Sequence, residues 1–76
     1  MKLVIQHPSG ENLLYVSFTP SEDVSVKIGE EVKNVKANKL FEWNGNTDKI
    51  EVSGEKEFNV IGMANYNWTF TLYSQE

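Results

Sequence analysis

NYNWTFTLY, residues 65–73, alternates polar and large apolar side chains near the end of the chain. Successive side chains of a β-strand point to opposite faces of a sheet, so this alternation is typical of a strand with one buried face. Burying each large apolar side chain contributes about 1.5 to 3 kcal/mol to stability. We therefore expect one set of residues from this strand to lie in the core: Tyr66, Trp68, Phe70 and Leu72.

The same period of two recurs along the chain, whereas no segment has the period of about 3.6 residues of an amphipathic helix. Strands are predicted at 3–6, 13–19, 24–28, 31–36, 39–43, 49–53, 57–63 and 65–73. About seven or eight short strands separated by turn residues predict an all-β fold, a small antiparallel β-sandwich or a partly open barrel. The pattern resembles immunoglobulin-like or jelly-roll-like sandwiches, a class that covers unrelated functions.

Two hairpins are predicted from turn residues. HPSGEN would join strands 3–6 and 13–19, and Asn44-Gly45, a strong turn signal, would join strands 39–43 and 49–53. Val32 and Val35 are out of phase for a regular strand, so segment 31–36 is expected to be an irregular edge or to contain a bulge. A short helix over residues 30–38 is the alternative for this segment.

Length and composition indicate one domain, residues 1–76. The chain is 39% hydrophobic with a net charge of -4, which favours a folded protein over a disordered one. It has no cysteine and therefore no disulfide framework. The acidic charge and the absence of arginine disfavour nucleic acid as a partner. The apolar run 3–5 is too short for a signal peptide or a membrane span, so we expect no membrane contact and a location in the cytoplasm or in a larger assembly.

Few residues offer chemistry of their own. His7 is the only histidine and has no cysteine beside it to complete a metal site or a nucleophile pair. Asn44, Asn46 and Asp48 have the spacing of a calcium loop, but Lys49 stands where that loop needs glycine. Most carboxylates fall in turns, where they have neither the burial nor the charged neighbour that a catalytic acid needs. We expect no enzyme activity, no cofactor and no metal.

An apolar surplus is predicted on strand faces opposite the core, where exposed patches are typical of interaction sites. It consists of Leu13, Tyr15, Ile61, Met63 and Tyr73. This pattern favours a non-enzymatic protein-binding or assembly module, such as a phage or virion component or a small inhibitor. The partner would be another protein or a second copy of the chain.

A carbohydrate-binding module is the alternative. Trp43 beside Asn44 and Asn46 offers an aromatic ring on which a pyranose can stack and amides that can bond its hydroxyl groups.

Overall fold

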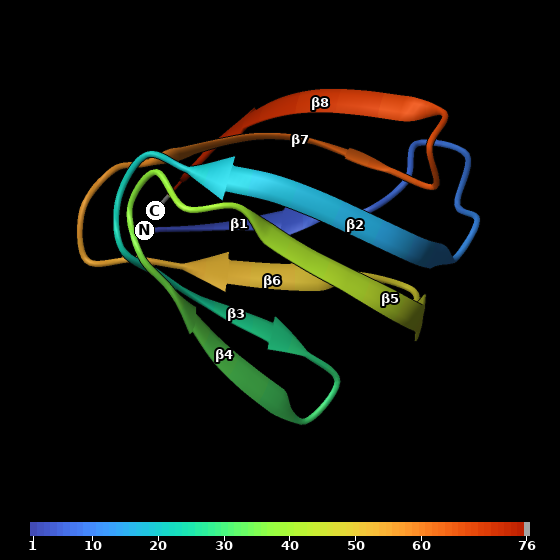
Figure 1. Ribbon diagram of the computed structural model, residues 1–76, viewed down its shortest axis with the longest axis horizontal. Coiled ribbons are helices and arrows are strands. Elements are labelled where there is room, and N and C mark those ends of the chain that lie inside the picture. Colours follow the sequence, from blue (N-terminus) through green and yellow to red (C-terminus); the bar gives the residue numbers. More distant parts are fainter. Residues whose placement is uncertain (76) are drawn as a thin grey trace.

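The computed structural model describes residues 1–75 as two four-stranded antiparallel sheets packed face to face (Figure 1). In order across the sheet, sheet A contains β1 (Lys2–Ile5), β6 (Ile50–Ser53), β3 (Val24–Ile28) and β4 (Glu31–Val35). Sheet B contains β5 (Phe41–Thr47), β2 (Leu13–Pro20), β7 (Asn59–Ala64) and β8 (Trp68–Tyr73). The predicted all-β antiparallel sandwich is confirmed.

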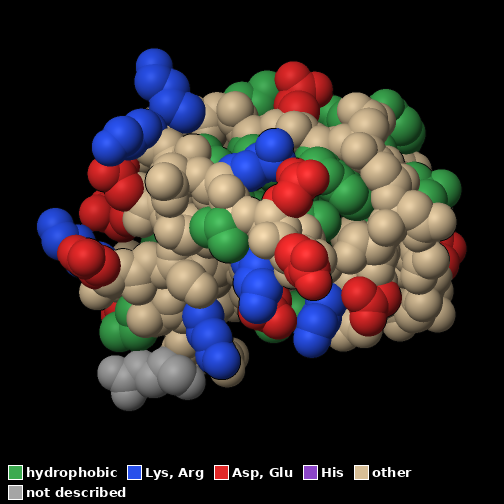
Figure 2. Space-filling view, turned by 90° about the horizontal axis from the view of Figure 1, so that it is seen from below, with side chains coloured by type: hydrophobic (Ala, Val, Ile, Leu, Met, Phe, Trp, Pro, Cys, Tyr) green, Lys and Arg blue, Asp and Glu red, His purple; other side chains and the backbone are tan. Residues whose placement is uncertain are grey.

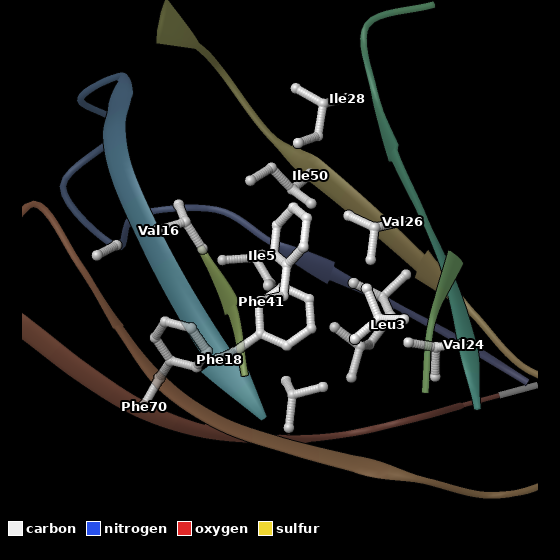
Figure 3. Close-up of a cluster of buried hydrophobic side chains, with 14 of the residues drawn as sticks. Leu3, Ile5, Val16, Phe18, Val24, Val26, Ile28, Phe41, Ile50 and Phe70 are labelled. Carbon is white, nitrogen blue, oxygen red and sulfur yellow. The ribbon is translucent and has the colours of Figure 1, made fainter. Parts of the chain in front are cut away.

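The core lies between the sheets and is aliphatic on one side and partly aromatic on the other. Valine, leucine and isoleucine side chains of sheet A face Phe18, Phe41 and Phe70 of sheet B (Figure 3). Across sheet B, Phe18 and Phe70 both pair with Gly62, which leaves room for their rings. The buried residues of both sheets follow the alternation of their strands, and they include Val16, Phe18, Val26, Ile28, Ile50, Val52, Phe58 and Val60.

Neither predicted hairpin forms. β1 pairs with β6 in sheet A, while β2 lies in sheet B between β5 and β7. Asn44 and Gly45 lie inside β5, where the ring of Trp43 packs closely over Gly45. Glycine at this position gives the ring space within a strand, so the turn prediction for Asn44-Gly45 is wrong.

Segment 31–35 is a regular strand at one edge of sheet A. The expected edge position is confirmed, whereas the expected irregularity or bulge and the alternative short helix are wrong. β4 pairs in unbroken register with β3, with Val35 opposite Val24 and Glu31 opposite Ile28. Val32 points outward and Val35 inward, which explains why the two valines are out of phase. Glu31 and Lys33 lie on the inward side of this edge and approach within 3.7 Å of each other. Inward-pointing charges of this kind protect an edge strand from pairing with other chains.

The sandwich is closed along its other side. The Lys2 N–H donates to the Gln75 carbonyl oxygen, and the Gln75 N–H donates to the Lys2 carbonyl oxygen, at 2.9 and 2.8 Å. These bonds join the start of β1 to the chain just after β8, and the two ends of the chain lie near each other (Figure 1). The edges of β4 and β5 have no such link to each other.

Candidate functional site

The outer face of sheet B collects most of the predicted interaction residues, and we call it the neutral face. Register places Ser17 beside Met63, Thr19 beside Ile61, and Thr69 and Thr71 beyond them on β8. The complete face comprises Tyr15, Ser17, Thr19, Glu42, Asn44, Asn59, Ile61, Met63, Tyr66, Thr69, Thr71 and Tyr73. Glu42 is the only member with an acidic or basic side chain that is charged at neutral pH. Ile61 and Tyr73 are 60% and 68% exposed.

Leu13 does not belong to this face, so its prediction is wrong. Leu13 is fully buried, and Leu14 is exposed in its place. The alternation of β2 breaks between them and Tyr15, because the N–H groups of Leu14 and Tyr15 both donate to Oδ1 of Asn65, at 2.7 and 3.2 Å. Two successive N–H groups on one acceptor rotate the strand locally, as in a β-bulge.

Asn65 is the residue that holds this end of the sandwich together, and sequence reasoning missed it. Its Nδ2 donates to Oε1 of Glu11 and to the carbonyl oxygen of Asn12, at 3.2 and 2.9 Å. One side chain therefore fastens the turn between β7 and β8 to the start of β2. The only sequence signal was an asparagine at the start of a turn, a position that this residue often takes.

Tyr66 lies in the turn between β7 and β8. The expectation that it belongs to the core is therefore wrong. Asn65 and Tyr66 have left-handed φ values of 52° and 61°, and the Asn67 N–H donates to the Ala64 carbonyl oxygen, as in a type I′ turn. Tyr66 is 73% exposed. Trp68 and Leu72 are partly buried against the core, and Phe70 is buried.

A stacked pair of tyrosines forms one end of the neutral face. The rings of Tyr15 and Tyr66 lie 4.3 Å apart and 9° from parallel. The Tyr15 hydroxyl donates to Oε2 of Glu42 at 3.2 Å, and Asn44 lies opposite Tyr15 in the β2 and β5 pairing. This end of the face therefore presents one flat aromatic surface with a carboxylate and an amide nearby.

The residues of the alternative carbohydrate site are not brought together. Trp43 pairs with Val16 and packs partly buried against the core, on the inner face of β5. Asn44 points the other way, toward Tyr15, and Oδ1 of Asn46 accepts a hydrogen bond from Nδ2 of Asn12 at 2.7 Å. Trp43 therefore does not share a surface with the two amides.

His7, Ser9 and Glu11 lie together in the loop between β1 and β2, an arrangement that sequence reasoning also missed. The Ser9 Oγ lies 2.7 Å from His7 Nδ1, and Glu11 Oε1 lies 3.5 Å from His7 Nε2. A hydroxyl, an imidazole and a carboxylate in this order occur in nucleophilic sites, which also need free N–H groups to bind an oxyanion. Here the Ser9 N–H donates to His7 Nδ1 and the Gly10 N–H to the His7 carbonyl oxygen. These bonds fix the loop.

The outer face of sheet A has a different character. Lys2, Lys27 and Glu51 lie on it, and Lys49 pairs with Glu51 at 3.5 Å. Seen from the side of β3, β4 and β6, lysine and acidic side chains are scattered over the surface (Figure 2). The two outer faces of the sandwich therefore differ in charge.

An open hollow at one end of sheet A has polar walls that are already paired with one another. Its lining includes Asp23, Ser25, Asn34 and Lys36. The Ser25 hydroxyl donates to Asn34 Oδ1, and Asp23 lies 3.7 Å from Lys36. The pKa of Asp23 is below its ordinary value, chiefly because the carboxylate accepts a hydrogen bond from the Ala37 N–H, with a smaller contribution from the charge of Lys36.

Two further observations concern metals and membranes. Within residues 1–75, no three histidine or acidic side chains lie close enough together to hold a metal ion. The same residues form no helix of the length and apolarity that a membrane span requires.

Comparison with protein families, curated proteins and solved structures finds no match to this chain.

Proposed function

We propose that the chain is a non-enzymatic protein-docking module that binds its partner through the neutral face. The observation that carries this proposal is the contrast between the two sheets: one outer face has several charges, and the other has Glu42 alone among its residues. The cores of protein interfaces are depleted in charged residues and enriched in tyrosine and methionine.

The exposed residues of the neutral face are not needed for the core. Val60, Gly62 and Ala64 are the inward residues of β7, and the two small ones lie beside the rings of Phe18, Phe70 and Trp68. Alternation along the strand therefore points Ile61 and Met63 outward. Exposed apolar groups that do not contribute to the core favour an interaction surface.

Two matched lysine substitutions test the proposal. Ile61 and Val32 are 60% and 62% exposed at outward-facing strand positions, but only Ile61 lies on the neutral face. Ile61→Lys should abolish the protein complex that the tagged chain forms in its own cells, because a lysine would be buried unpaired at the interface. Val32→Lys should leave that complex intact. Cross-linking followed by native mass spectrometry measures both.

Three outcomes would contradict the proposal. The chain could form no complex with any protein or with itself, the complex could survive Ile61→Lys, or both lysine variants could lose it equally. Thermal unfolding of both variants shows whether each has kept its fold.

Carbohydrate binding is the second candidate, and the exposed ring of Tyr66 favours it. Stacking on Tyr15 holds this ring flat, and Glu42 and Asn44 lie near enough to Tyr15 to serve as hydrogen-bond partners for sugar hydroxyls. A pyranose would stack on the free side of the Tyr66 ring. This version of the site uses Tyr66 where the sequence suggested Trp43.

Tyr66→Gly separates this candidate from protein docking. Glycine adopts the left-handed conformation of this position without steric strain, so the gain of about 1 kcal/mol from the backbone offsets the loss of the ring stack. The variant should therefore remain folded and lose any glycan recognized on an array, while Trp43→Phe should retain it. A glycan signal that Tyr66→Gly leaves unchanged excludes the site at Tyr66.

A further inference from the structure

We infer that the partner of the neutral face is a second copy of this chain, joined to the first by a two-fold axis. This inference rests on the proposed docking function and names its partner. In a two-fold dimer the same patch is used on both copies, so residues near the axis meet their own counterparts.

The middle of the neutral face is complementary to itself. Its two central strands, β2 and β7, present Ser17, Thr19, Ile61 and Met63. A hydroxyl group both donates and accepts hydrogen bonds, so a serine or threonine can pair with its own copy. Apolar side chains also pack against their own kind. No residue of this central group would place like charges opposite each other.

The single carboxylate of the face borders that centre on one side, because Glu42 lies opposite Ser17 in the β2 and β5 pairing. Glu42 is on β5, the edge strand of sheet B, and its Oε2 accepts a hydrogen bond from the Tyr15 hydroxyl. Two copies can therefore meet over β2 and β7 with their Glu42 side chains at the margin. Charged groups at a rim remain solvated and have little effect on affinity.

The net charge also favours this face for self-association. Each copy carries a net charge of -4, so two copies repel each other on average. The neutral face lets them approach without bringing carboxylates together. It also lacks the pattern of charges by which a different protein is usually selected.

The face is large enough for a dimer. The molecule measures 29 × 24 × 23 Å, and the sheets extend along the longest axis (Figure 1). One outer face therefore offers at most about 700 Å² to a partner, near the roughly 800 Å² per partner of a standard protein interface. A dimer that used this whole face would lie at the smaller end of the stable class.

Sedimentation velocity of the purified chain tests the inference without any other protein. Between about 5 μM and 500 μM the average mass should rise from that of a monomer to that of a dimer. This range brackets the dissociation constant that we expect for a dimer with an interface of this size. Ile61→Lys should weaken the dimer at least about 100-fold, because each copy would place an unpaired lysine in the interface. Val32→Lys should associate like the original chain.

A second pair of variants does not depend on inserting a charge. Ser17 and Ser25 are partly exposed outward serines on β2 and β3, interior strands of the two sheets. The chain has no cysteine, so Ser17→Cys and Ser25→Cys each accept one bulky maleimide group. The group at position 17 should prevent association, and the group at position 25 should not.

A chain that stays monomeric at about 500 μM would overturn the inference. So would a dimer that persists in Ile61→Lys or after labelling at position 17. A dimer that is lost in Val32→Lys or after labelling at position 25 would also overturn it. A monomeric chain whose complex with another protein depends on Ile61 overturns the dimer and leaves the docking function standing. A monomer that binds only glycans through Tyr66 overturns both.

Discussion

At the scale of single residues, hydrogen bonds from a few polar side chains decide how loops and strand ends are placed. Asn65 makes four such bonds across the end of the sandwich, and Asp23 connects the loop before β3 to the Ala37 N–H after β4. Both residues accept hydrogen bonds from backbone N–H groups of distant segments. Their removal should therefore have measurable effects, for different reasons.

Asn65→Gly should lower the free energy of unfolding by about 2 kcal/mol, because the Leu14 and Tyr15 N–H groups lose their acceptor. Asn65→Ala should cost about 1 kcal/mol more, since alanine is strained at a positive φ. Urea unfolding measures both. Asn67→Ala is the control: this exposed neighbour should change stability by less than about 0.5 kcal/mol. Equal stability of Asn65→Gly and the original chain would show that these bonds contribute nothing.

Asp23 should make stability depend on pH in the acid range. Its folded pKa lies below the ordinary value of 3.8, so its contribution is complete above that value and is lost as the pH falls through the folded pKa. Asp23→Asn keeps an oxygen for the Ala37 N–H but removes the charge. At pH near 6 the original chain should unfold at a higher temperature than Asp23→Asn, and the difference should shrink below pH 3.8. A difference that stays constant down to the lowest pH would contradict this assignment.

At the scale of strands, the sequence predicts which residues face the core better than it predicts which strands pair. Alternation marks Val26 and Val52 as buried whichever sheet their strands join. The pairing of Leu3 with Val52 depends on contacts between distant parts of the chain, and nothing in strand 3–6 alone indicates it. The turn signal of Asn44-Gly45 is overridden because Gly45 makes room for the Trp43 ring.

For the candidate site too, alternation along a strand predicts which residues share a face, and contacts between distant segments are not predicted. Alternation places Ile61, Met63 and Tyr73 on the outer face of sheet B, where the structure has them, and what they bind remains a prediction. It fails for Leu13, because the Asn65 side chain breaks the period of β2 from a turn about fifty residues away. A side chain that reaches across the molecule leaves no periodic signal near its target.

Gly62→Ala tests how closely β7 packs within sheet B. A methyl group at this position would contact the Ser17 carbonyl oxygen and lie 2.7 Å from Cα of Phe18, and a backbone cannot easily move away. We expect a loss of about 3 kcal/mol in the free energy of unfolding. Gly54→Ala is the comparison, because there the nearest atom belongs to the Phe58 ring, at 3.1 Å, and the cost should be about 1 kcal/mol. Similar losses in the free energy of unfolding for the two variants would mean that β2 and β7 move apart enough to accommodate the methyl group.

At the scale of the whole molecule, the two sides of the sandwich end in different ways. The backbone bonds between Lys2 and Gln75 join the sheets on one side. On the other side β4 and β5 remain separate edges, and the inward pair of Glu31 and Lys33 protects β4. Edge-to-edge assembly is therefore opposed at the edges of β1, β4 and β8, and the proposed docking uses a sheet face and not an edge.

The bonds between Lys2 and Gln75 should contribute to stability through the backbone and not through the glutamine side chain. Gln75→Pro removes the N–H that donates to the Lys2 carbonyl oxygen, and it should lower the free energy of unfolding by about 1 to 2 kcal/mol. Gln75→Ala keeps that N–H and should change stability by less than about 0.5 kcal/mol. Amide exchange at Lys2 should also quicken in the proline variant alone, because its N–H donates to the Gln75 carbonyl oxygen across the same link. If the proline and alanine variants have the same free energy of unfolding, the link between Lys2 and Gln75 adds no stability and the two sheets are held by their core alone.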